Sequence, residues 1–244
     1  MSDEILANRE ASPFEVPIKR ITCAERYRWF ELSLILLISF GNSIMGSLYV
    51  LKYGRTMLPY LNDSRWTAGI LHELTCLLLL GYILSRRRLR LRDLGLRWSL
   101  RDLGIGIVIT VAAYLAYTVG YLIVHSLHRA LFSSATSGVA FRDVFSHPSI
   151  MAIPFILLNP FFEELIVRAY LMTEVRDLTG SWTTSAALSV LIQFSYHLYY
   201  GWEGAIALSF QFLVFSIYYA RTRRATPIIV AHGIFDIYGL IWLS

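Results

Sequence analysis

The chain has 244 residues, of which 56% are hydrophobic and only 16% are charged, and its mean hydropathy is +0.53. Soluble domains carry about 25% charged residues, so this composition argues against a soluble fold and favours membrane-spanning helices. The formal net charge of +5 does not indicate nucleic-acid binding, because the basic clusters directly follow apolar runs, as cytoplasmic loops of membrane proteins do.

Residues 1–28 are predicted to form a cytoplasmic N-terminal tail. They are largely polar and contain no apolar run near the start, so we expect no cleavable signal peptide, and the first span serves as its own insertion signal. An all-α bundle of about seven transmembrane spans is predicted. The spans are Trp29–Leu51, Thr67–Leu84, Leu103–His125, Ile150–Glu174, Ser181–Tyr200, Gly204–Ala220 and Thr226–Leu243.

The basic residues between the spans predict the orientation of the bundle. Lys19, Arg20, Arg26 and Arg28 place the N-terminus in the cytoplasm. The clusters Arg86–Arg92 and Arg221–Arg224 follow the second and sixth spans and place the ends of these spans on the same side, so the C-terminus is expected outside. Ser85–Arg101 is predicted to be a basic, amphipathic connector on that surface. Ser126–Ser149 is predicted to be a polar loop on the opposite side, and spans four and five meet in the cytoplasm near Gly180.

Ionisable residues inside the apolar spans are the first functional signal. A charged side chain near the middle of a bilayer costs about 2.5–3.5 kcal/mol on insertion scales, so it is rare and usually functional. These residues concentrate in the C-terminal half, at Glu163, Glu164, Arg168, His197, His232 and Asp236. The first three spans carry only Glu31, His72 and Glu73 near their ends; we assign His72 and Glu73 structural roles.

Helical spacing pairs some of these residues. Glu164 and Arg168 are separated by four positions, so they share a helix face and can form an ion pair. Glu163 lies about 100° around the helix from Glu164 and has no such partner in its own span, so it is predicted to be the free carboxylate. His232 and Asp236 likewise share one face of the last span.

Depth along the spans brings the pairs together. Spans four and five are antiparallel about a turn at Gly180–Ser181, and Glu164 and His197 each lie 16 residues from that turn, or about 24 Å, so they are level. His232 lies only six residues into the last span and is predicted to be shallower, while Pro160 is predicted to kink span four. Carboxylates and two imidazoles converging in a semi-buried pocket indicate a hydrolytic site.

Three motifs in this region resemble those of a known family. Glu163–Arg168 forms EExxxR, His197 is the histidine of a second motif, and His232–Asp236 forms HxxxD. Their order and spacing resemble the CPBP (Abi) family, which contains CAAX proteases and bacteriocin-processing or immunity proteins. The resemblance covers residues 149–243, predicted to be the catalytic core, whereas residues 29–148, the N-terminal helices with the basic connector, carry no motif.

The chain departs from the family pattern in one motif and selects one option in another. The second motif is often FxxxH, but here Gln193 occupies the position of Phe, four residues before His197. This departure affects which contacts can hold the His197 side chain. The third motif ends in Asn or Asp in the family, and here it ends in Asp236. This choice matters for the mechanism because Asp can ligate a metal or carry charge.

The resemblance implies an intramembrane endopeptidase. Its expected substrate is a membrane-associated or prenylated-type protein or peptide, met at the lipid bilayer. Nothing in the chain marks a eukaryotic protein, so we expect a bacterial inner-membrane protein with a cytoplasmic N-terminus.

Two mechanisms are compatible with these residues. In the first, which we favour, no cofactor is used: Glu163 and His197 hold and deprotonate water, His232 with Asp236 serves the oxyanion, and the pair Glu164–Arg168 is scaffold. In the second, Glu163 or its neighbour ligates Zn²⁺ together with His197 and His232, leaving one position for water. The sequence contains no HExxH motif that would decide between them.

Structural interpretations of the same residues are also possible. Taken singly, Glu164–Arg168 could be a buried ion pair, His197 an interfacial histidine beside tyrosines, and His232 with Asp236 a helix-packing pair. The alternative function is a non-catalytic bacteriocin-immunity or peptide-binding membrane protein that retains the motif residues. A transporter is disfavoured because no inverted repeat is found. The sequence does not identify the substrate or the oligomeric state.

Overall fold

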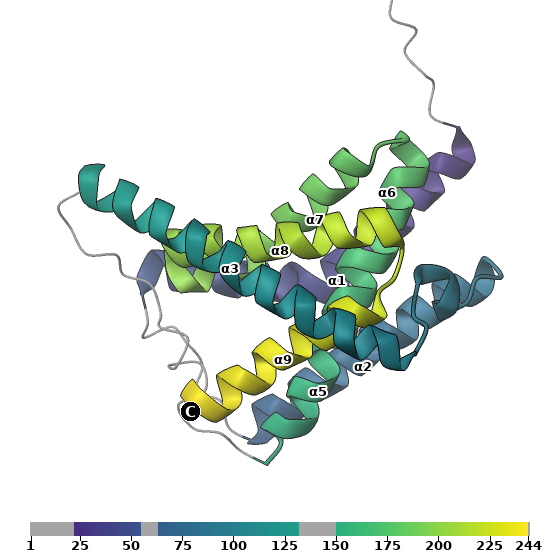
Figure 1. Ribbon diagram of the computed structural model, residues 1–244. Helices are drawn as coiled ribbons and strands as arrows, with labels where there is room; N and C mark the ends of the chain where they lie inside the picture. The colour runs from purple at the N-terminus through teal and green to yellow at the C-terminus, as the bar shows by residue number, and fades with distance from the viewer. Residues whose placement is uncertain (1–21, 55–62, 132–149, 244) are drawn as a thin grey trace, which may run out of the picture.

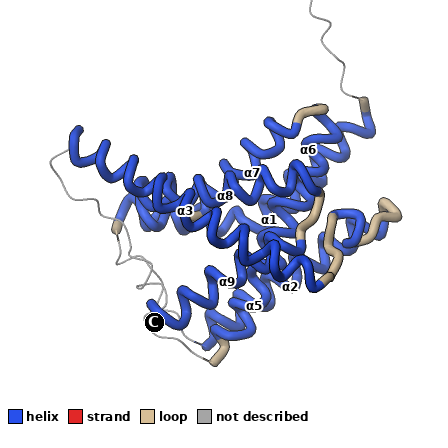
Figure 2. The backbone as a smooth tube through the Cα atoms, in the orientation of Figure 1, coloured by secondary structure: helices blue, strands red, loops and turns tan. Residues whose placement is uncertain are grey.

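The computed structural model describes residues 22–54, 63–131 and 150–243, and all the regular secondary structure in these ranges is helical (Figures 1 and 2). The predicted all-α class is therefore confirmed. Most of the predicted N-terminal tail and residues 132–149 of the predicted polar loop lie outside the described residues. The start of that loop was predicted wrongly, because residues 126–131 continue a membrane-spanning helix.

The helices occupy the predicted positions in the chain. They are α1 Cys23–Tyr53, α2 Asp63–Arg86, η2 Leu91–Leu94, α3 Leu100–Leu131, α5 Ala152–Glu163, η3 Glu164–Tyr170, α6 Leu171–Thr179, α7 Trp182–Tyr196, η4 Leu198–Tyr200, α8 Gly201–Thr222 and α9 Thr226–Leu243. In the described part of the chain, four segments are long and apolar enough to cross a membrane: α1, α2, α3 and the stretch formed by η4 and α8. The apolar helix α9 is shorter.

The fourth predicted span is divided into three pieces rather than being one helix. Pro160 lies in the last turn of α5, where it lacks the N–H that an α-helix requires at that position. The chain then widens into the π-helix η3 before it continues as α6. All seven residues of η3 are buried. Such π-helical turns are rare and are often found at functional sites.

The η3 segment lies in the core of the helical bundle. In Figure 1, α3 and α8 run side by side and α9 crosses beside α5. The most extensive contacts are those of α3 with α8 and α9, of α7 with α6 and α8, and of α2 with α5. Ile166 and Tyr170 of η3 are completely buried in the main apolar cluster with Phe40 of α1, Leu80 of α2 and Phe215 of α8. Residues of η3 therefore lie where charges are hardest to accommodate.

One ionic network joins α1, α2 and α6. Arg87, just after α2, pairs with Glu31 of α1 and lies 2.7 Å from Glu174 of α6, which also accepts a hydrogen bond from Arg28. Burial lowers the pKa of the Arg87 guanidinium, but hydrogen bonds to the two glutamates outweigh this effect and hold the pKa above its ordinary value. The N-terminal part of α1, the end of α2 and the first turn of α6 therefore lie on one side of the bundle.

A second set of contacts fixes the start of α9. The Ala225 N–H donates to the Gly95 carbonyl at 3.0 Å, and the Thr226 hydroxyl bonds both backbone groups of Arg97 at 3.0 and 2.8 Å. Gly95 has φ +89°, and a Cβ at this position would lie 2.1 Å from the Arg223 carbonyl oxygen. Only glycine fits this contact, which sets the depth of α9 in the bundle.

The close packing of α3 on α9 predicts a position that is sensitive to one methyl group. A Cβ on Gly106 would lie 2.5 Å from Val230 Cγ1 and 2.8 Å from its Cβ, whereas a Cβ on Gly104 would meet nothing within 4 Å. We expect Gly106→Ala to lower the free energy of unfolding in detergent by about 1–3 kcal/mol, because overpacking forces the helices apart. Gly104→Ala is the control and should leave stability unchanged or slightly raised. Equal stability of the two variants would contradict the packing.

Candidate active site

Glu163 is the last residue of α5 and is held by α7. Its Oε2 accepts a hydrogen bond from the Tyr196 hydroxyl at 2.6 Å and another from Gln193 Nε2 at 3.4 Å. The side chain is buried, and both donors are neutral. As predicted, no cation of its own span pairs with this carboxylate, but it is not without partners, because α7 supplies two neutral hydrogen-bond donors.

Glu164, the first residue of η3, points to different partners. Its Oε1 lies 2.8 Å from His232 Nδ1, and its Oε2 lies 3.7 Å from Arg168 Nε. The predicted pairing with Arg168 is therefore present, but at a distance too long for a hydrogen bond. The shorter contact is with the histidine of α9.

Arg168 is completely buried and connects three segments of the bundle. Its guanidinium donates to Ser189 Oγ at 2.9 Å, to Gln193 Oε1, and to the Phe212 carbonyl at 3.4 Å. These acceptors lie on α7 and α8. A buried guanidinium with several acceptors is far less costly than one without them.

Gln193 stands where the family's second motif often has Phe, and it is central to the cluster. Its amide oxygen accepts from Arg168 while its amide nitrogen donates to Glu163. Its backbone carbonyl lies 2.9 Å from His197 Nδ1. The departure from the motif thus places a polar bridge between the cation, the carboxylate and the backbone that holds the histidine.

His197 follows the last residue of α7 and lies among aromatic rings. The ring centroids of Tyr196 and Phe212 are 4.6 and 4.9 Å away. Because a carbonyl only accepts hydrogen bonds, Nδ1 carries the hydrogen and Nε2 has a free lone pair. His197 interacts electrostatically with His232 and Glu164. Within the described ranges, no hydrogen bond or ion pair joins it to Glu163 or His232.

His232 and Asp236 share one face of α9, with His232 Nε2 3.6 Å from Asp236 Oδ1. Asn159 of α5 donates to Asp236 Oδ2 at 3.3 Å. The prediction that His232 lies at a shallower level was wrong, since it contacts Glu164 directly. The anchored start of α9 and the division of span four bring the two residues to the same depth.

Sequence reasoning missed several neutral residues that hold this cluster. It named Gln193 only as a motif departure and gave no role to Tyr196, Asn159 or Ser189. These are polar side chains in apolar spans, so a search for neutral as well as charged residues would have found them. Their partners would still have remained unknown.

Glu73 of α2 was assigned a structural role, but it belongs to the same region. It is 3% exposed, and its Oε2 has no hydrogen-bond partner within the described ranges. It interacts electrostatically with Glu163, Asp236 and His232. A buried carboxylate oxygen without a donor is costly, so its position within the site calls for a function.

The predicted zinc ligands Glu163, His197 and His232 do not form a recognisable metal site in the described residues. Within residues 22–54, 63–131 and 150–243, no three His, Cys, Asp or Glu side chains are arranged to hold a metal ion. Glu163 Oε2 is occupied by two donors, and His232 lies between two carboxylates. In this arrangement the predicted ligand set therefore does not fit a zinc ion.

The fold and the cluster define a polytopic membrane protein with carboxylates, imidazoles and a guanidinium gathered inside a helical bundle. Residues 145–238, which contain all six predicted site residues, match the family model of type II CAAX prenyl endopeptidase Rce1-like. No curated protein and no solved structure matches the chain. This part of the integral membrane protein is therefore similar to type II CAAX prenyl endopeptidases, which are membrane proteases, and the predicted resemblance to the CPBP family is confirmed at that level.

The bridging role of Gln193 predicts a large effect on stability. Gln193→Leu removes the hydrogen bonds to Arg168 and Glu163, so we expect the free energy of unfolding to fall by about 2–4 kcal/mol. Gln211→Leu is the matched control, since Gln211 is also buried but makes no side-chain hydrogen bond to a described residue. Thermal unfolding in mild detergent would measure both. A similar loss in the two variants would refute the bridge.

Proposed function

We propose that this protein is an intramembrane endopeptidase that uses Glu163 to activate water and cleaves a membrane-associated or prenylated-type protein or peptide. The observation that carries the proposal is the contrast between the two neighbouring glutamates. Glu163 has only neutral hydrogen-bond donors, whereas Glu164 lies between Arg168 and His232. The match to a protease family over the same segment supports this assignment.

Glu163 is suited to accept a proton because one of its oxygens is available. Tyr196 and Gln193 both bind Oε2, and Oε1 accepts no hydrogen bond from a described residue. In the proposed first step, Oε1 takes a proton from a water molecule whose other hydrogen points to His197 Nε2. The resulting hydroxide attacks the carbonyl carbon of the scissile bond, and the carbonyl electron pair moves onto oxygen.

His232 is suited to stabilise that oxyanion. When both ring nitrogens carry hydrogen, Nδ1 donates to Glu164, while Nε2, 3.6 Å from Asp236, is not committed to a hydrogen bond. Its hydrogen can therefore be donated to the oxyanion. As the C–N bond breaks, the leaving nitrogen takes the proton held by Glu163. The products are a carboxyl group and an amine, and the Glu163 carboxylate is restored.

Substitution of the proposed base tests this function. We expect Glu163→Gln to reduce cleavage of a prenylated-type peptide by the purified protein in nanodiscs by at least about a hundredfold, because amide nitrogen cannot take the proton. Glu203→Gln is the control: this buried carboxylate of α8 is held by His125 and His128 and should retain full activity.

Two other outcomes would change the proposal. A chelator that stops cleavage, with recovery on addition of Zn²⁺, would replace the metal-free mechanism by the zinc mechanism. If the wild-type protein cleaves no peptide while Glu163→Gln retains its full biological effect, the immunity or peptide-binding alternative is favoured.

Glu73 is proposed to bind the substrate backbone, since its buried Oε2 has no hydrogen-bond partner among the described residues and its carboxyl group interacts electrostatically with Glu163. We expect Glu73→Ala to raise KM about tenfold with kcat nearly unchanged, as loss of one hydrogen bond predicts. Glu73→Gln keeps a carbonyl acceptor and should have a smaller effect. Steady-state kinetics and thermal unfolding would be compared: lower stability with unchanged KM in both variants would indicate a packing role instead.

A further inference from the structure

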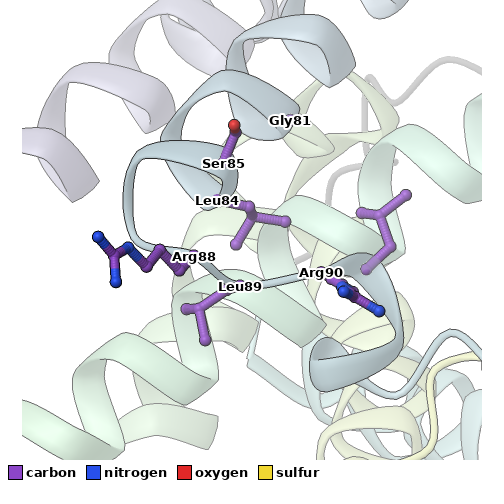
Figure 3. A pocket seen from close by; sticks show the side chains of 7 residues that line it. Gly81, Leu84, Ser85, Arg88, Leu89 and Arg90 are labelled. Carbon is purple, nitrogen blue, oxygen red and sulfur yellow. The ribbon is translucent and has the colours of Figure 1, made fainter.

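A hollow of about 460 Å³ lies where α2 ends and the basic connector begins, away from the candidate active site (Figure 3). Its apolar lining includes Leu84 from the last turn of α2, together with Leu89 and Leu91 of the connector. Its polar lining is formed by Ser85, Arg88 and Arg90. The hollow is therefore amphiphilic, with leucines beside hydrogen-bond donors.

The two arginines that line the hollow differ from nearby arginines in their ion pairing with the described residues. Arg87 next to them binds two glutamates, and Arg224 lies 2.6 Å from Asp102. By contrast, the guanidinium groups of Arg88 and Arg90 form no ion pair with any described carboxylate, and both residues are exposed. Figure 3 shows the Arg88 and Arg90 side chains on opposite sides of the hollow, so two unneutralised cations flank it and favour an anionic ligand.

The backbone at this hollow is also unusual. Arg88 has φ +58°, a left-handed conformation that costs a non-glycine residue about 1 kcal/mol or more. The turn is closed by the Leu89 N–H, which donates to the Leu84 carbonyl at 2.9 Å. Glycine would adopt this helix-terminating conformation without strain. Here the position carries an arginine whose side chain lines the hollow.

The location indicates which anion can reach it. The helix α2 is long and apolar enough to span the membrane, and Leu78 and Tyr82 near its end are 74% and 60% exposed, as expected for side chains that face lipid. Trp98 of the connector is 61% exposed, which is typical of an interfacial anchor. The end of α2 therefore lies at the level of the lipid headgroups.

We propose that this hollow binds the phosphate of an anionic phospholipid. Arg88, Arg90 and the Ser85 hydroxyl supply donors to the phosphate, and the leucines contact the first part of the acyl chains. A free phosphate ion would use the donors but would gain nothing from the apolar lining. Basic residues next to a membrane span attract anionic lipids, and the hollow gives this attraction a defined place.

Lipid binding by the full chain tests the proposal. Binding of phosphatidylglycerol and of phosphatidylcholine would be measured by native mass spectrometry from detergent, for the wild type and for Arg88→Gln/Arg90→Gln. We expect the wild type to prefer phosphatidylglycerol and the double variant to lose roughly ten- to thirtyfold in affinity for it, since each arginine contributes about fivefold. Binding of phosphatidylcholine should change little.

The matched control is Arg101→Gln/Arg221→Gln, which removes the same charge from two exposed arginines that do not line the hollow. It should retain the preference, and an equal loss in both double variants would reduce the effect to general charge and overturn the proposal. Arg88→Lys/Arg90→Lys, which keeps the charge, should bind better than the glutamine variant if folding is intact. Displacement of the lipid by millimolar inorganic phosphate would overturn the assignment of a lipid and indicate a phosphate site.

Discussion

The complete burial of the Arg168 guanidinium is the constraint around which the C-terminal helices are arranged. An isolated charge in the apolar interior would be too costly, so the surrounding segments must supply acceptors. Ser189, Gln193 and the Phe212 carbonyl provide them from α7 and α8, and Glu164 provides the counter-charge. Because Gln193 also contacts Glu163 and carries the carbonyl that binds His197, satisfying one cation orients two other groups of the site.

The π-helical segment η3 after α5 places two adjacent carboxylates in different environments. Glu163 ends an α-helix and turns to neutral donors on α7, while Glu164 begins η3 and meets His232 of α9. Contrasting surroundings are a recurrent way to give two neighbouring carboxylates different chemical roles. This contrast, rather than the presence of the motif alone, supports the proposed roles.

The N-terminal helices contribute to the site although the family match does not include them. Phe40 of α1 stacks on Tyr196 with ring centroids 4.8 Å apart, and His72 of α2 meets Phe162 at 6.0 Å. Phe40 therefore packs against Tyr196, which binds Glu163, and His72 packs against Phe162, which precedes Glu163 in α5. Glu73 adds a carboxylate from the same helix as His72. Residues 150–243 and the first helices therefore form one packed unit in the described part of the chain.

The positions of the spans and the six motif residues were determined by the sequence itself, because apolar length and i, i+4 spacing are local properties of a helix. The pairs Glu164–Arg168 and His232–Asp236 were predictable for that reason. Only the tertiary structure decided that Glu164 contacts His232, and that Gln193, Tyr196 and Asn159 complete the cluster. These contacts join residues far apart in the chain, so they depend on the rotation and relative depth of packed helices. Hydropathy and periodicity within a single span carry no information about either quantity.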